Sequence, residues 1–195
     1  MAEDLVRIFI AVPVPPDALA ACQALLQGVR TTGHEQGARW VRTENLHLTV
    51  RFLGEVEADV MPDVAIAMTA AVASIRPFRI TLSGAGAFPA PDRPRSLWLG
   101  IVEGGEGLAD LSAALQAPLD ALGWDRDDRP FRPHLTVGRT DATPRRTGAA
   151  TAAALVAAAR DWELSFAADR VVLYQSHLSG GPAHYLPLAE ALLRG

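Results

Sequence analysis

The sequence lacks lysine altogether, so all 18 of its basic residues are arginines. Acidic residues outnumber them, and the formal net charge at pH 7 is −4. This balance excludes a protein that attracts nucleic acid over its whole surface by positive charge. A local site is not excluded, because a few arginines gathered in one cleft can hold a phosphate through their forked N–H donors.

Cysteine and long apolar runs are equally scarce. Cys22 is the only cysteine, which excludes an intramolecular disulfide and a cysteine metal cluster. No apolar run approaches the roughly 20 residues of a membrane-spanning helix. The N-terminal stretch is typical of a first strand rather than an export signal. We therefore expect a cytoplasmic protein with no membrane partner and a single ordinary domain, and a monomer is the default expectation.

Apolar periodicity and turn residues predict alternating strands and helices. The first half is predicted to contain a strand at 7–12, a helix at 18–29 capped by Asp17, a short strand at 39–42, a strand at 46–53 ended by Gly54, a helix at 60–74 and a strand at 78–82 ended by the glycines at 84–86. The second half follows with a strand at 96–102, a helix at 108–122, a strand at 132–137, a helix at 149–159, strands at 162–166 and 171–174, and a hairpin region at 178–188.

Two segments of the chain occur twice. The tetrapeptide His-Leu-Thr-Val stands at 47–50 and again 87 positions later, and the apolar run at 7–12 is matched at 96–101, 89 positions later. Segments that recur in the same order at nearly one offset favour an internal duplication over coincidence. We therefore predict an α+β fold of two similar lobes, about 1–90 and 91–195 with their termini exchanged, joined by a linker at 89–95. Each lobe would have an antiparallel-rich sheet with outer helices, and the lobes would surround a central cleft.

The repeated tetrapeptide has the residues of an acid/base site. Side chains alternate along a strand, so His47 and Thr49 share one face, as do His134 and Thr136. A neutral imidazole can take a proton from an attacking water while an imidazolium protonates a leaving oxygen. Threonine hydroxyls can donate to the oxygens of a phosphate. Neither strand face has a second metal-binding side chain, so the pattern indicates phosphoryl transfer without a metal or other cofactor.

The two motifs also indicate a family. The segments NLHLTVRFLG (45–54) and RPFRPHLTVGR (129–139) resemble the two signatures of the 2H phosphoesterase superfamily. Within it the chain is similar to the bacterial and archaeal RNA 2′,3′-cyclic phosphodiesterases, historically called 2′-5′ RNA ligases. RIFIAV (7–12), PRSLWLG (94–100) and GPAHY (181–185) fit the same family, so the resemblance covers nearly the whole chain.

This resemblance implies a bilobal fold and hydrolysis of a 2′,3′-cyclic phosphate at an RNA end to a 2′-phosphate, with reversible 2′-5′ ligation as a second activity. It implies that His47 protonates the 3′ leaving oxygen, that His134 accepts the proton of the attacking water, and that Thr49 and Thr136 hold the phosphate. The RNA partner would carry a 3′-terminal cyclic phosphate, with tRNA fragments among the candidates.

Four further side chains have open assignments. Arg139 matches an arginine that contacts phosphate in relatives, but strict alternation points it away from the cleft. Either Gly138 bends the strand or Arg139 lies at the surface. Arg51 and Arg132 have the strand parity of the histidine in their own motif and are candidates for RNA contacts, although solvated edge arginines explain them as well. Tyr185 is a candidate for stacking or hydrogen bonding, or a structural tyrosine.

Three functions remain open at this point. A metal-independent RNA-end phosphodiesterase fits both motifs. A related enzyme with a small substrate, such as ADP-ribose cyclic phosphate or a cyclic mononucleotide, would use the same residues. A non-catalytic RNA-binding module ranks last, because both His-x-Thr pairs are intact. Phe52, on the opposite parity to the first His-x-Thr pair, is expected in the core in every case.

Overall fold

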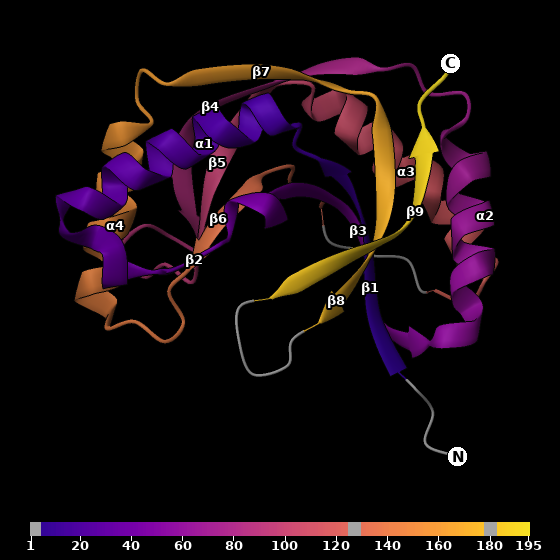
Figure 1. Cartoon of the computed structure of the whole chain (residues 1–195), viewed down its shortest axis with the longest axis horizontal. Helices are drawn as coiled ribbons and strands as arrows, with labels where there is room; N and C mark the ends of the chain where they lie inside the picture. The colour runs from indigo at the N-terminus through magenta and orange to yellow at the C-terminus, as the bar shows by residue number, and fades with distance from the viewer. Residues whose placement is uncertain (1–4, 125–129, 178–182) are drawn as a thin grey trace.

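Two antiparallel sheets and four α-helices form the fold in a computed structural model of the chain (Figure 1). The structure describes residues 5–124, 130–177 and 183–195. The first sheet has the strand order β3 (His47–Glu57), β1 (Leu5–Pro13), β8 (Arg170–His177), β9 (His184–Leu192). The second has the order β2 (Arg39–Trp40), β6 (Leu135–Arg139), β5 (Ser96–Glu103), β4 (Phe78–Phe88), β7 (Glu163–Ala168). The predicted α+β class with antiparallel sheets is confirmed.

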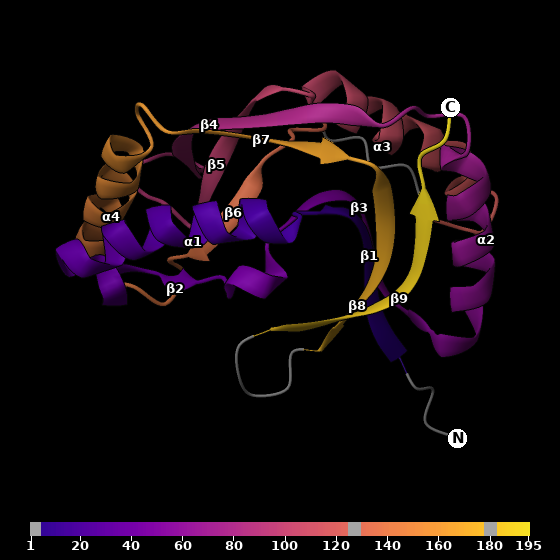
Figure 2. The same cartoon turned by 45° about the horizontal axis from the view of Figure 1, so that its top comes forward.

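Each sheet is covered by a pair of helices. Helices α2 (Met61–Val72) and α3 (Gly105–Asp120) contact each other and reach β9 and β3 of the first sheet, while α1 (Pro16–Val29) and α4 (Arg145–Ala158) contact each other and reach β7 and β4 of the second. In Figures 1 and 2, α1 and α4 lie together at one side of the molecule and α2 lies at the opposite side. Among the described helices none is both long and apolar enough to cross a membrane.

The sheets combine segments that lie far apart in the sequence. The first sheet joins β1 and β3 to β8 and β9 from the end of the chain, and the second sheet takes β4 from the first half. Their buried faces form one core. On α3, the predicted helical spacing places its leucines inward, and each is at most 1% exposed: Leu108, Leu111, Leu115 and Leu119. Burying one leucine side chain contributes roughly 1.5–3 kcal/mol.

The strands that carry the two motifs share an irregularity. Ala11 pairs with Thr49 but Ile10 pairs with Arg51, so Val50 is an extra residue in β3. In the second sheet Trp98 pairs with Thr136 but Leu97 pairs with Gly138, so Val137 is an extra residue in β6. Both are β-bulges, and a bulge reverses the facing of every residue that follows it. The duplicated motif therefore includes a duplicated bulge.

The strand pairings also correct the predicted alignment of the two halves. Partners of the threonines, Ala11 and Trp98, are 87 positions apart, as the two histidines are. The predicted offset of 89 for the first strands is wrong by two residues. If two strand segments are aligned with an error of two residues, buried and exposed side chains still alternate in the same way. The sequence alone therefore does not reveal this error of alignment.

Three predicted boundaries are wrong for local reasons. Strand β3 continues through Gly54 and β4 through Gly84, because each glycine adopts a positive φ, 81° and 67°, beside a further register shift. Helix α1 begins at Pro16, with Pro15 rather than Asp17 at the cap position. Part of the predicted hairpin, 178–182, lies outside the described residues, but β8 and β9 on either side of it are antiparallel partners.

Candidate active site

The two motif histidines are held in the same way. His47 is the first residue of β3, and His134 stands immediately before β6. Nδ1 of His47 lies 2.7 Å from the carbonyl oxygen of Asn45, and Nδ1 of His134 lies 2.6 Å from that of Arg132. A carbonyl oxygen only accepts, so Nδ1 donates in both rings. The proton-free nitrogen of each neutral imidazole is therefore Nε2.

The structure brings the two motifs together from different sheets. Strands β3 and β6 contact each other. The imidazoles are close enough that the charge of His134 lowers the pKa of His47. Two proton-free Nε2 atoms thus belong to one site, with one contributed by each copy of the duplicated segment.

Burial among aromatic rings keeps His47 neutral. Its ring centroid lies 4.8 Å from that of Phe9, 5.1 Å from that of Tyr185 and 6.2 Å from that of Tyr174. Burial lowers the pKa of His47 to about 4, against the opposing effect of its hydrogen bond to Asn45. At neutral pH the ring is uncharged when no anion is bound.

His134 has a similar but less enclosed environment. Phe88 meets it edge-on with ring centroids 5.1 Å apart, and Phe88 also packs on Trp98. Burial lowers the pKa of His134, the hydrogen bond to the Arg132 carbonyl opposes this, and the charge of Arg139 lowers it further. Both motif histidines are therefore neutral bases near pH 7 until a negative charge enters the site.

Hydroxyl groups and a guanidinium complete the donors around the histidines. Thr49 and Thr136 are half-buried, and neither hydroxyl has a hydrogen bond within the described parts of the chain. Arg139 is exposed and pairs with Ser96, so the bulge at Val137 turns it to the face of Thr136. The strand is thus irregular, but its extra residue is Val137 rather than Gly138, and Arg139 also lies at the surface.

The same bulge geometry overturns two predictions for the first motif. Arg51 is only 6% exposed and points away from Thr49, where its Nη1 donates to Oε1 of Gln116 on α3 at 3.3 Å. The assignment of Arg51 as an RNA contact is therefore wrong. Phe52 was expected in the core but is 60% exposed. It pairs with Phe9 on the face of the histidine.

The remaining predicted residues, Arg132 and Tyr185, both adjoin the histidines. The Arg132 side chain is exposed, and its carbonyl orients His134. The Tyr185 ring meets both Phe9 and His47 edge-on. Burial raises the pKa of Tyr185, and the charges of Arg139 and Arg7 lower it in part. Tyr185 therefore lies within electrostatic reach of two arginines.

Sequence reasoning missed the residues that hold this arrangement. Asn45 is 8% exposed, and its amide donates to the Ala183 carbonyl at 2.6 Å. Asn45 thereby connects the motif to the start of β9, which carries Tyr185. Its position two before His47 was a signal, because Arg132 stands at the same place in the second copy. The described residues contain no group of three histidine, cysteine or carboxylate side chains that could hold a metal.

Known proteins resemble this chain in sequence and in fold over most of its length. RNA 2′,3′-cyclic phosphodiesterases from Thermotoga maritima and Escherichia coli are each 30% identical over 97% and 93% of this chain and 96% and 93% of their own. One from Archaeoglobus fulgidus is 36% identical over 68% of this chain and 72% of its own. E. coli LigT complexed with 3′-AMP superposes with a TM-score of 0.76 at 26% identity, covering 98% of this chain and all of LigT.

A structure from Thermus thermophilus has a TM-score of 0.75 at 28% identity, covering 97% of this chain and 98% of its own. The family model of the 2′-5′ RNA ligase superfamily matches residues 14–180. The resemblance found in the motifs is thereby confirmed, and the chain belongs to the 2′-5′ RNA ligase superfamily.

Proposed function

We propose that this protein hydrolyses 2′,3′-cyclic phosphates at RNA ends to 2′-phosphates, without a metal, through His47 and His134. The observation that carries this proposal is the pair of imidazoles, each with Nδ1 tied to a carbonyl and Nε2 left as the reactive nitrogen. The names of the relatives, RNA 2′,3′-cyclic phosphodiesterase, support the substrate.

The reaction assigns opposite tasks to the two rings. His134 takes a proton from water as the water oxygen attacks phosphorus, and His47 gives a proton to the departing 3′ oxygen. The bond from phosphorus to the 3′ oxygen breaks, which leaves a 3′ hydroxyl and a 2′-phosphate. The Thr49 and Thr136 hydroxyls and the Arg139 guanidinium stabilise the charge on the non-bridging oxygens.

Substrate binding lets the histidine pair take up from solvent the proton that this scheme needs. Because the pKa of His47 is about 4, it is neutral in the free protein and cannot serve as the acid. The negative phosphodiester, placed between the rings, raises the pKa of both imidazoles. The active complex then holds one proton on the pair, and the proposed assignment places it on Nε2 of His47.

The wider setting of this activity is also part of the proposal. We propose a single domain of two lobes, about 1–90 and 91–195, that exchange strands. Strand β4 of the first half lies in the second sheet, and β8 and β9 of the second half lie in the first sheet. In the reverse direction, the same residues would join a 2′,3′-cyclic phosphate to a 5′ hydroxyl, which is 2′-5′ ligation. We further propose a monomer in the cytoplasm that acts on RNA fragments, tRNA fragments among them.

A small cyclic nucleotide is the second candidate substrate. Phe52 presents an exposed ring beside Phe9, so one base can stack there with no further nucleotide present. The residues around the histidines therefore fit a mononucleotide as well as an RNA end.

Product analysis tests the proposal directly. An oligonucleotide ending in a 2′,3′-cyclic phosphate, incubated with the protein in EDTA, should give a 2′-phosphate. His47→Ala and His134→Ala should each lower the rate by at least ~10²-fold. His34→Ala is a matched control, because His34 lies away from the motifs, beside Thr151 on α4. Full activity in the His47→Ala/His134→Ala double variant, or a 3′-phosphate product, would refute the mechanism.

A further inference from the structure

Side chains on the histidine face of the first sheet lie in rows across its strands, because antiparallel partners point to the same side. The row nearest the histidines consists of Thr49, Ala11 and Val172. The next row, the aromatic row, consists of Phe52, Phe9 and Tyr174. The third row, which we call the arginine row, consists of Glu55, Arg7, Ser176 and Tyr185.

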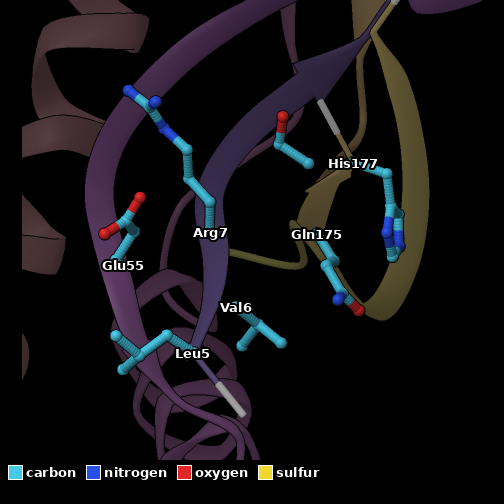
Figure 3. Close-up of a pocket in the computed structure, with 7 residues that line it drawn as sticks. Leu5, Val6, Arg7, Glu55, Gln175 and His177 are labelled. Atoms are coloured by element: carbon cyan, nitrogen blue, oxygen red, sulfur yellow. The ribbon is translucent and has the colours of Figure 1, made fainter. Parts of the chain in front are cut away.

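Arg7 is the positive centre of the arginine row. It stands two residues from Phe9 on β1, which places it about 7 Å farther along the strand. Arg7 is exposed and takes part in no ion pair among the residues that the structure describes. With Glu55 and Ser176 it lines an open cavity of about 230 Å³, and in Figure 3 its side chain lies on the same side of β1 as Glu55, opposite to Gln175 and His177.

The arginine row adjoins His47 through Tyr185. The charges of Arg7 and Arg139 both act on Tyr185, whose ring meets that of His47 edge-on at 5.1 Å. Ser176 stands between Arg7 and Tyr185 in the row, so two hydroxyl-bearing residues follow Arg7 across the strands. Glu55 is the neighbour on the other side and repels an anion there. Of the neighbours of Arg7 in the row, Ser176 and Tyr185 are therefore the ones that can donate to an anion bound there.

The order of the rows matches the order of groups in an RNA end. From the histidines outward the face offers the Thr49 hydroxyl for the reacting phosphate, aromatic rings for a base, and then a guanidinium. From its terminus inward an RNA offers the cyclic phosphate, the terminal nucleoside, and then a charged phosphodiester. Aromatic platforms beside positive charges are the general means of binding single-stranded nucleic acid.

We propose that Arg7, with Ser176 and Tyr185, binds the phosphodiester that joins the terminal nucleotide to the rest of the RNA. This rests on the proposed function and deepens it, because it makes an oligonucleotide the better substrate than a mononucleotide. A mononucleoside cyclic phosphate has no second phosphodiester to place beside Arg7. The contact between Arg7 and this phosphodiester therefore distinguishes an RNA end from a small cyclic nucleotide as the substrate.

Three substrates that share the same reacting end test this proposal. They are a mononucleoside 2′,3′-cyclic phosphate, a dinucleotide with the same end, and that dinucleotide with an uncharged methylphosphonate linkage. In the wild-type protein kcat/KM should be highest for the charged dinucleotide and should fall with added salt. Arg7→Gln should lower the ratio of charged to methylphosphonate dinucleotide by about tenfold, since it removes a charge-assisted hydrogen bond. Its salt dependence should be shallower.

Arg160→Gln is the matched control, because it removes an exposed arginine just after α4, on the helix layer of the other sheet. Its ratio should equal that of the wild type. Equal losses of Arg7→Gln on the charged and methylphosphonate dinucleotides, or no wild-type preference between them, would overturn the Arg7 assignment. Failure of the proposed function has a different signature, because none of the three substrates would then be turned over.

Discussion

Phe52 and Arg139 occupy the same place in the two copies of the motif, five residues after His47 and His134. The duplicated bulge turns both of them to the histidine side of their sheets, opposite Phe9 and Ser96. One copy thus offers an exposed ring and the other a guanidinium. The two copies of the motif are therefore asymmetric: under the proposed function, the first would stack on a base and the second would hold a phosphate.

Replacing Phe52 by alanine should weaken substrate binding without unfolding the protein. The ring is 60% exposed, so little buried surface is lost and the melting temperature should stay within a few degrees. Stacking on one base contributes about 1–3 kcal/mol, so kcat/KM should fall roughly tenfold or more. Val102→Ala, which truncates another exposed apolar side chain on β5, is the control. A large drop in thermal stability with unchanged KM would restore the core assignment of Phe52.

Arg51 and Arg139, the arginines of the two motifs, should respond oppositely to substitution. Arg139→Gln should lower kcat by about 10²-fold with unchanged stability, because its charge faces the site. Arg51→Met should instead lower the free energy of unfolding by about 1–3 kcal/mol, because it leaves the partly buried Gln116 Oε1 without this donor. Urea denaturation and single-substrate kinetics on both variants separate the two effects. A catalytic defect in folded Arg51→Met would contradict its placement.

Bulges explain why some of this site was predictable from the sequence and some was not. His47 and Thr49 lie in one strand, β3, so alternation within the strand was enough to place them together. The facing of Arg51 and Phe52 depends on an extra residue that only the pairing with β1 reveals. The contact between Tyr185 and His47 likewise requires β9 to join the first sheet, which is a long-range pairing that no local pattern encodes.

Activity should depend on pH through the pair of lowered histidine pKa values. The proposed mechanism needs one proton on the pair, and in the free protein that form exists between the pKa of His47, about 4, and that of His134, which is below 6.5. We therefore expect kcat/KM to peak below pH 6.5 and to fall at higher pH. The kcat profile should lie at higher pH, because bound phosphate raises both pKa values.

The Arg139→Gln variant tests why kcat/KM declines at high pH. The charge of Arg139 lowers the pKa of His134. Arg139→Gln should therefore move the high-pH decline of kcat/KM to higher pH, even though its absolute rate is lower. Measured profiles in which kcat/KM still rises from pH 7 to pH 8.5 would be incompatible with the assignment.

Stability should fall in acid because of His47. Its pKa is about 4 in the folded protein and 6.5 for an unperturbed histidine, so the unfolded chain binds the proton more strongly. The free energy of unfolding therefore decreases as the pH drops from about 6.5 towards 4, and the full effect of one such group is about 3 kcal/mol. His47→Asn removes the titrating ring, so its stability should vary less over this range by roughly 2–3 kcal/mol. Urea denaturation at pH 7 and pH 4.5 on both proteins measures the difference. If the free energy of unfolding varied with pH equally in both proteins, the pKa of His47 would not be lowered by folding. His47 would then have no reason to be neutral in the free protein.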